Sequence, residues 1–159
     1  MTSIFGDRAY RGVLTRRDFI TLAALAAVST VAGCAANPVT GQSQLMLMSE
    51  GEEIQVDKVN APHQFSADYG VTQDAGLNAY VRGVGMALAR SSHRAHMPYQ
   101  FNVVNATYVN AYAFPGGSIA ITRGILAELD NEAELAGLIG HELGHVNARH
   151  TAASMSKSK

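Results

Sequence analysis

The chain has 159 residues, of which 47% are hydrophobic and 16% charged, and its formal net charge is −1. This length and composition predict an ordinary globular domain with a single core. Nucleic-acid binding is excluded because the charge balance provides no basic surface and the aromatic residues are not interleaved with arginines.

The N-terminal segment predicts export from the cytoplasm. Two arginines, Arg16 and Arg17, precede an uncharged apolar run, "FITLAALAAVSTVAG", which ends at Gly33. The run has 15 residues, whereas a helix that crosses a bilayer needs roughly 20. Residues 1–33 are therefore predicted to be a signal peptide, with a transmembrane span as the alternative. "TRRDFI" also resembles a twin-arginine export signal, although paired arginines occur in ordinary signals too.

The stretch "VAGC", residues 31–34, resembles the lipobox of bacterial lipoproteins, in which the cysteine is lipidated and becomes the first mature residue. Cys34 is the only cysteine, so an intrachain disulfide is excluded. A lone cysteine is often a small buried hydrophobe, but its place directly after the apolar run favours lipidation. Ala35 rather than aspartate follows it, which by the same resemblance favours the outer membrane. Residues 34–48 are predicted to be a tether.

Residues 49–159 are predicted to form the folded domain, beginning with two helices. Ser49 and Glu52 have the spacing of a capping box, and Pro62 is expected to interrupt the helix that they open. A second helix is predicted from about Asp74 to Arg90, because apolar residues recur there at three-and-four spacing. These core residues are Leu77, Val81, Val84 and Leu88.

Extended segments follow the second helix. "YQFNVV", residues 99–104, alternates apolar and polar residues as a half-buried strand does. "YVNAYAF" and "SIAIT" flank the turn sequence "PGG" and are predicted to be two further strands. The sequence therefore predicts an α+β fold, in which helices pack against a small antiparallel sheet or hairpin.

The last predicted helix begins at a second capping-box pattern, Asn131 with Glu134. Its apolar residues form one stripe, namely Leu135, Leu138, Ile139, Leu143 and Val146. A glycine inside a helix costs about 1 kcal/mol relative to alanine. We therefore expect the helix glycines to admit close approach by a neighbouring element. These are Gly137, Gly140 and Gly144.

The same helix carries "HELGH", residues 141–145. His141 and His145 are one helical turn apart, so their side chains lie on one face about 5–6 Å from each other and can share one zinc ion. Glu142 lies about 100° around the helix from His141. Its side chain can therefore reach a water bound to the metal but is angled away from the metal itself. Peptide hydrolysis needs this arrangement, because zinc acidifies the water while the glutamate accepts its proton. The alternative is an amphipathic helix whose histidines are solvated or packed.

A third zinc ligand is harder to identify. His150 is nine residues after His141, which at about 100° per residue places it on the opposite side of a straight helix, so it is not expected to be a ligand. Glu134 is the best placed of three alternative glutamates, Glu128, Glu132 and Glu134, but roughly 10 Å along the axis is too far without a helix break. The metzincin pattern is excluded, since Ala148 and Thr151 occupy its glycine and histidine positions.

Three stretches together, "NPVTGQSQLMLMSEGEE", "NAYAFPGGSIAITRGIL" and "NEAELAGLIGHELGHVNARH", resemble the lipoprotein branch of the zinc metallopeptidases that include the prenyl-CAAX endopeptidase and the heat-shock protease HtpX. The resemblance implies a zincin-like fold with the active-site helix near the C-terminus. It implies Zn²⁺ held by His141 and His145, with Glu142 as the base and a third ligand from a glutamate on a later helix. It also places an extended edge beside the substrate, formed by Asn110, Ala111, Tyr112 and Ala113, for which plain core is the alternative.

The residues after His150 include no Asp, Glu, His or Cys. We therefore expect a chain truncated within or just after its active-site helix, without the third ligand and with part of the apolar stripe uncovered. The predicted function is a zinc metalloendopeptidase of the bacterial envelope that hydrolyses misfolded or misassembled envelope proteins. It is expected on the periplasmic face of the outer membrane, held there by its lipid. The alternatives are a non-catalytic lipoprotein that binds unfolded outer-membrane proteins, and an inactive fragment.

Overall fold

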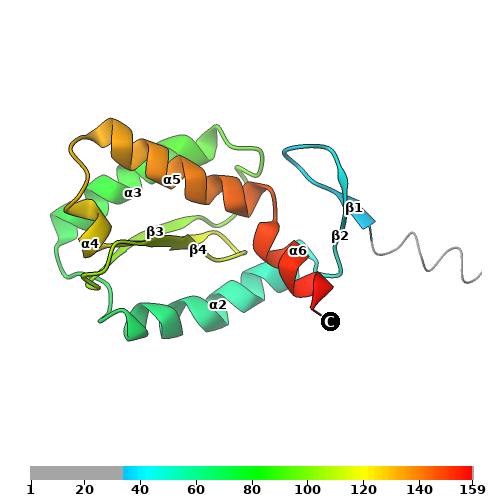
Figure 1. Ribbon diagram of the computed structural model, residues 1–159, viewed down its shortest axis with the longest axis horizontal. Helices are drawn as coiled ribbons and strands as arrows, with labels where there is room; N and C mark the ends of the chain where they lie inside the picture. The colour runs from blue at the N-terminus through cyan, green and yellow to red at the C-terminus, as the bar shows by residue number, and fades with distance from the viewer. Residues whose placement is uncertain (1–33, 159) are drawn as a thin grey trace, which may run out of the picture. The chain divides into compact units, whose positions relative to one another are not determined.

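The computed structural model of the protein describes residues 34–158, so the predicted signal peptide lies outside the described residues, as do residues 31–33 of the predicted lipobox. The described elements follow the order β1 (Cys34–Ala36), β2 (Ser43–Leu45), α2 (Glu50–Ala67), α3 (Ala75–Arg90), β3 (Gln100–Val104), β4 (Ala111–Ala113), β5 (Ser118–Thr122), α4 (Arg123–Leu126), α5 (Glu132–Asn147) and α6 (His150–Lys157). Helices α3 and α5 cover one face of a three-stranded sheet and α2 covers the other (Figure 1). The predicted α+β fold is confirmed. None of the helices within residues 34–158 is long and apolar enough to span a bilayer.

The three-stranded sheet has the order β3-β5-β4. The predicted hairpin is present, because β4 and β5 are antiparallel and Tyr112 pairs with Ala120. Of the two predicted alternatives, an antiparallel sheet or a hairpin, the structure has the hairpin, because the third strand, β3, runs parallel to β5. The loop after β3 crosses the end of β5 to reach β4, and Gly124 makes room for it. A Cβ atom on Gly124 would lie 2.2 Å from the carbonyl oxygen of Thr107.

Helix α2 begins at the predicted capping box. The Ser49 hydroxyl accepts a hydrogen bond from the Glu52 N–H at 3.3 Å, and the Glu52 carboxylate accepts one from the Ser49 N–H at 2.7 Å. The predicted interruption at Pro62 is wrong, because α2 continues through it to Ala67. Pro62 lies on the exposed side of α2, where the Lys58 carbonyl that loses its helical partner can bond to water.

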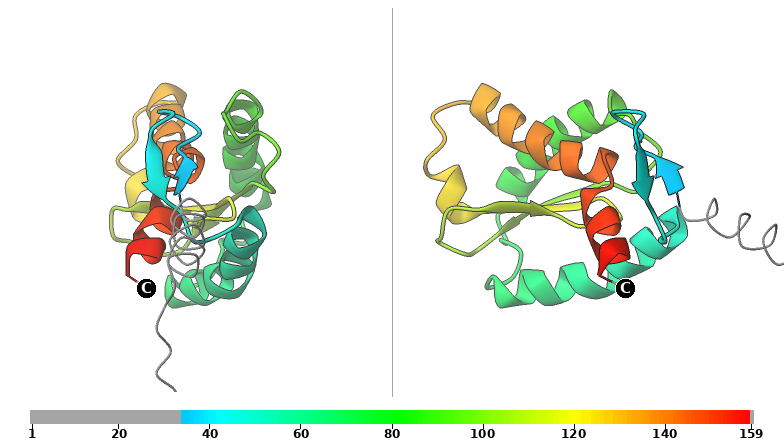
Figure 2. Two further views of the ribbon diagram at one scale, coloured as in Figure 1. Left: turned by 90° about the vertical axis from the view of Figure 1, so that its right-hand side faces the viewer. Right: turned by 45° about the vertical axis from the view of Figure 1, so that its right-hand side comes forward.

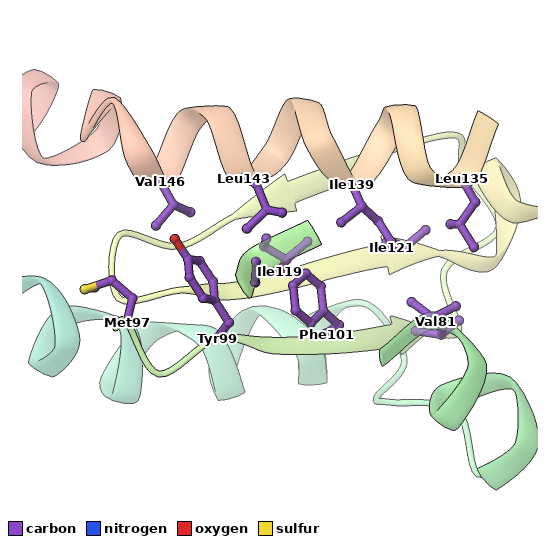
Figure 3. Packing of buried hydrophobic residues seen from close by; sticks show 12 residues of the cluster. Val81, Met97, Tyr99, Phe101, Ile119, Ile121, Leu135, Ile139, Leu143 and Val146 are labelled. Carbon is purple, nitrogen blue, oxygen red and sulfur yellow. The ribbon is translucent and has the colours of Figure 1, made fainter. Parts of the chain in front are cut away.

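The core lies between the sheet and the pair α3 and α5 (Figure 3). Phe101 and Val103 of β3 and Ile119 and Ile121 of β5 contribute the sheet side, and all four are buried. Alternate residues of each strand point to the same face, so these four meet the helices together. The helices contribute Val81, Ala89, Leu135, Ile139, Leu143 and Val146.

Two expectations about α5 are wrong. Its apolar stripe is largely covered, since Leu135, Ile139 and Leu143 are each at most 4% exposed and Leu138 is half-buried against the same core. The three helix glycines do not admit a neighbouring element either. A Cβ atom built on Gly137, Gly140 or Gly144 would meet nothing within 4 Å, and all three glycines lie on the exposed face of α5. The same face carries His141.

Residues 34–48 are not a free tether in the structure. Strands β1 and β2 pair as an antiparallel hairpin beside the junction of α5 and α6 (Figure 2). The Asn37 and Gln44 side-chain amides both donate to the carbonyl of Ala148, at 3.2 Å each. Further along, the Leu47 N–H donates to the Ser156 hydroxyl at 3.0 Å. The hairpin therefore satisfies a carbonyl at the C-terminal end of α5 that the helix itself leaves unpaired.

Candidate metal centre

Helix α5 presents the motif residues as its sequence predicted. Asn131 caps the helix by accepting a hydrogen bond from the Glu134 N–H at 3.0 Å, which confirms the predicted start. Nearly three turns after this cap, His141 is exposed and His145 is half-buried on the same side of the helix. Their Nε2 atoms are 3.1 Å apart. The α5 backbone therefore brings one nitrogen of each imidazole to a common point at the surface.

This separation fits a shared zinc ion. Two nitrogen ligands at about 2.05 Å from a tetrahedral zinc lie about 3.3 Å from each other. The observed 3.1 Å between the Nε2 atoms of His141 and His145 is close to that value. The two rings are nearly perpendicular, at 83°, with their centroids 4.8 Å apart. Both residues therefore have the geometry of metal ligands.

Glu142 differs from the histidines in its surroundings. Its side chain is 8% exposed, and it accepts no hydrogen bond from any residue between 34 and 158. Its two carboxylate oxygens are not among the buried side-chain atoms that lack a partner, so water can reach them. A carboxylate with open acceptor positions, one residue after His141 on the same helix, is suited to receive a proton.

The expectation that His150 points away from the site is wrong. Helix α5 ends at Asn147, and Arg149 adopts a left-handed conformation with φ of 58°, so α6 starts in a new direction at His150. The Nδ1 atoms of His145 and His150 are consequently 2.9 Å apart. The prediction assumed a straight helix, and the sequence contains no glycine or proline at the turn that would have signalled the break.

A buried charge cluster holds this turn. Arg149 donates from Nε to Glu53 at 2.9 Å and from Nη2 to the Met48 carbonyl at 2.7 Å. Glu53 is fully buried and also accepts a hydrogen bond from Arg94 at 2.6 Å. Arg94 in turn donates to the carbonyl of Val146, near the end of α5, at 2.8 Å. Sequence analysis missed this cluster, because its members come from distant segments with no local spacing.

Within residues 34–158 no three His, Cys, Asp or Glu side chains are grouped as a complete metal site. His145 faces His141 with Nε2 and His150 with Nδ1, so the three imidazoles cannot all bind one ion in this arrangement. The alternative glutamate, Glu134, accepts a hydrogen bond from the Asp130 N–H at the start of α5. Glu132 likewise accepts one from the Tyr80 hydroxyl at 2.8 Å. The described centre is therefore a pair of histidines with an adjacent carboxylate.

The predicted substrate edge lies on β4, an outer strand of the sheet beside α5. Asn110 accepts from the Thr122 N–H at 3.1 Å, and the Phe114 N–H donates to Ser118 at 2.8 Å. Bonded positions alternate along an antiparallel pair, so Tyr112 also faces β5. The backbone groups of Ala111 and Ala113 then point away from the sheet. Of the four residues predicted to contact substrate, these two present free N–H and C=O groups.

Strand β4 is fixed to α2 by a carboxylate, Asp68, which is 4% exposed. The hydroxyls of Tyr112 and Tyr108 both donate to it, the latter at 2.7 Å. Burial by itself would raise the pKa of Asp68, but hydrogen bonds from the two tyrosines and from Gln64 lower that pKa below its ordinary value. Burial and the adjacent carboxylate raise the pKa of Tyr112. The edge strand is therefore held by an ionised aspartate at neutral pH.

A cleft of about 480 Å³ opens where β4 ends. It lies between α2, the turn that follows β4, and α6, and its lining does not include the three motif residues. Phe114 and Pro115 continue the chain directly from β4 into its wall, and Thr151, the residue after His150, lines the opposite side. The cleft therefore begins next to the C-terminal end of β4.

Comparison with known proteins supports the same type of centre. A family model described as peptidase family M48 matches residues 75–159. The chain is 30% identical over 118 residues to a β-barrel assembly-enhancing protease of Escherichia coli (strain K12), covering 74% of this chain and 24% of that relative. It is 28% identical over 152 residues to the mitochondrial metalloendopeptidase OMA1 of Arabidopsis thaliana, covering 96% of this chain and 30% of that relative.

A protease HtpX homolog of Acidiphilium cryptum is 38% identical over 89 residues, covering 54% of this chain and 30% of that relative. The chain thus spans less than a third of the length of each of these relatives. The matched region nevertheless contains α3, the three-stranded sheet and the whole of the histidine motif. Since the family model covers more than half of its residues, the chain belongs to peptidase family M48.

Proposed function

We propose that the protein is a zinc-dependent metalloendopeptidase whose metal is held by His141 and His145. The observation that carries the proposal is the 3.1 Å separation of their Nε2 atoms at the surface of α5, with Glu142 as the residue that follows His141. Membership of family M48 supports the same chemistry. A third ligand completes such a site, and the family resemblance assigns it to a glutamate on a later helix.

When bound, zinc supplies Lewis acidity, which polarises the scissile carbonyl and makes water a better nucleophile at neutral pH. Each histidine contributes its Nε2 lone pair to hold the metal. Glu142 acts as general base, accepting a proton from the attacking water on its carboxylate. It then returns this proton to the leaving amine as the peptide bond breaks.

The substrate is proposed to be an unfolded or misassembled envelope protein. Ala111 and Ala113 offer free backbone groups on the edge of the sheet, and such an edge pairs with any extended chain through main-chain hydrogen bonds. Only a segment that has lost its own secondary structure has these groups available. A peptide lying on β4 would reach the cleft beside Phe114 and Pro115, where one of its side chains can be buried. This arrangement selects the unfolded state rather than a particular sequence.

The proposed location is the periplasmic face of the bacterial outer membrane, through a lipid on Cys34. Two observations support it. The sequence around Cys34 resembles a lipobox, and the E. coli relative is named a β-barrel assembly-enhancing protease.

The test measures zinc binding and casein hydrolysis by the protein, alone and in a form extended by a glutamate-bearing helix of the kind that the family resemblance implies. His141→Ala is expected to lose both zinc and activity. Glu142→Gln is expected to keep zinc and lose at least about 10²-fold in rate, because the amide cannot accept a proton. Chelator-sensitive cleavage that survives in Glu142→Gln would remove this residue from the mechanism.

The alternative is a non-catalytic protein that binds unfolded clients along the same edge. It predicts casein binding without tight zinc binding and without cleavage in either form. The experiment separates the two functions, because only the peptidase loses its activity when zinc is removed.

A further inference from the structure

The His145 imidazole contacts another histidine on each side. Its Nε2 lies 3.1 Å from His141, and its Nδ1 lies 2.9 Å from Nδ1 of His150. A neutral imidazole carries its proton on one nitrogen only. If Nε2 is to bind a metal, the proton must be on Nδ1, and that N–H needs an acceptor in line with the ring. The Nδ1 atom of His150 is at hydrogen-bonding distance from it.

We propose that His150 is a positioning residue for the metal centre. It accepts a hydrogen bond from the Nδ1–H of His145, and this bond fixes the tautomer and ring orientation in which Nε2 of His145 is free for the metal. The inference rests on the proposed function, because it assigns His145 as a ligand. His150 itself does not contact the metal. It lies beside Nδ1 of His145, whereas the metal is proposed to bind Nε2 of His145, the nitrogen that faces His141.

The position of His150 is set by the rest of the fold rather than by its own packing. The left-handed turn at Arg149 directs the chain toward His145, and Glu53 and the Met48 carbonyl hold that arginine. The first turn of α6 is anchored by Ala152 and Ala153, which are buried against Met46 and Met48. These contacts fix the backbone of His150 whatever side chain it carries.

The His150 side chain, by contrast, is exposed. Substitution there removes a surface ring and leaves the buried contacts of the turn intact, so variants are expected to fold. An exposed histidine that only formed part of the surface could be replaced without effect on metal affinity. A histidine that orients a ligand could not, because losing such a partner typically costs about 10–100-fold in metal affinity.

The experiment compares His150→Phe with His150→Asn in the full chain. Phenylalanine keeps a ring but has no acceptor, whereas the asparagine side-chain oxygen replaces Nδ1 at nearly the same distance from the backbone. Zn²⁺ affinity is measured by competition with a chromophoric chelator. His150→Phe is expected to weaken binding about tenfold or more, and His150→Asn to restore most of the loss. Unchanged affinity in His150→Phe would overturn the proposal. A loss in His150→Asn as large as in His145→Ala would overturn it too, by making His150 a direct ligand.

A second measurement separates failure of this inference from failure of the proposed function. Long-range ¹H–¹⁵N NMR spectra of the metal-free protein at pH 8 report which nitrogen of His145 is protonated. The expected result is the Nδ1–H tautomer in the wild-type protein and in His150→Asn, and a shift toward the Nε2–H tautomer in His150→Phe. If the wild-type protein bound no zinc, the proposed function would fail and this spectrum would still decide the role of His150. The same tautomer population in all three proteins would contradict that role.

Discussion

Glu53 accepts a hydrogen bond from Nε of Arg149 at 2.9 Å, although 96 positions separate them in the sequence. The carboxylate is completely buried, and it also binds Arg94, whose side chain is 3% exposed. The bond between Glu53 and Arg149 joins the first turn of α2 to the turn between α5 and α6. Because that turn places His150 beside His145, a contact that involves none of the histidines helps to determine the surroundings of the metal centre.

Replacing Glu53 by alanine is expected to lower the free energy of unfolding by about 3 kcal/mol or more, since it removes the shared partner of the buried Arg94 and the partly buried Arg149. Urea denaturation measures the change. Glu128→Ala is the matched control, because Glu128 is an exposed glutamate and its loss should stay within about 0.5 kcal/mol. Equal losses in the two variants would show that the buried cluster does not stabilise the fold.

Replacing each of two helix glycines by alanine is expected to change the free energy of unfolding in opposite directions. A Cβ on Gly137 would meet nothing within 4 Å, so Gly137→Ala should raise the free energy of unfolding by about 0.5–1 kcal/mol through helix propensity. A Cβ on Gly85 would lie 2.5 Å from the ring of Phe101, so Gly85→Ala should lower it by about 1–3 kcal/mol. Thermal and urea unfolding measure both, and a stabilising Gly85→Ala would contradict the packing described here.

The contribution of Asp68 to stability is expected to depend on pH. Hydrogen bonds from Tyr112 and Tyr108 lower the pKa of Asp68 below its ordinary value of 3.8, despite the opposing effect of burial. A carboxyl with a lowered folded-state pKa stabilises the protein above the unfolded-state pKa, and this contribution is lost as the pH falls through the folded-state value. Asp68→Asn should therefore be less stable than the wild-type protein at pH 7. The difference should shrink below about pH 4. Urea midpoints across this range give the measurement, and a constant difference would argue against an ionised Asp68.

Zinc is expected to stabilise the folded protein if His141 and His145 bind it. A ligand that binds only the folded state at about 100 times its Kd adds about 2.7 kcal/mol. The melting temperature should rise with zinc, fall back with chelator, and stay constant in His141→Ala. Magnesium is the control, because this hard ion prefers oxygen ligands to imidazoles. A zinc-dependent shift that persists in His141→Ala would place the metal elsewhere.

Lipidation of Cys34 is tested in bacterial cells with a labelled fatty acid. Cys34→Ser is expected to abolish labelling and leave an uncleaved precursor, because serine offers no thiol to the lipid-transfer reaction. Label that persists in the variant would show that the lipid is attached at another residue. With β1 beginning at Cys34 and the hairpin bonded to Ala148, the lipid would be joined to the folded unit without a long linker.

Several features could be predicted from the sequence because they depend on local spacing. The caps at Ser49 and Asn131, the helix that ends at Arg90 and the β4–β5 hairpin all follow from residues within a few positions of one another. The pairing of His141 with His145 belongs to this class. Four residues make about one helical turn, so any helix brings their side chains together.

Other features were decided only when distant segments met. The parallel pairing of β3 with β5 depends on a loop that crosses the sheet at Gly124. The placement of His150 depends on Arg149, which adopts a left-handed conformation that costs energy for any residue except glycine. That cost is offset by the buried carboxylate of Glu53 from the other end of the domain. The helical period alone directs His150 away from the metal centre, and an ion pair between residues 96 positions apart brings it back beside His145.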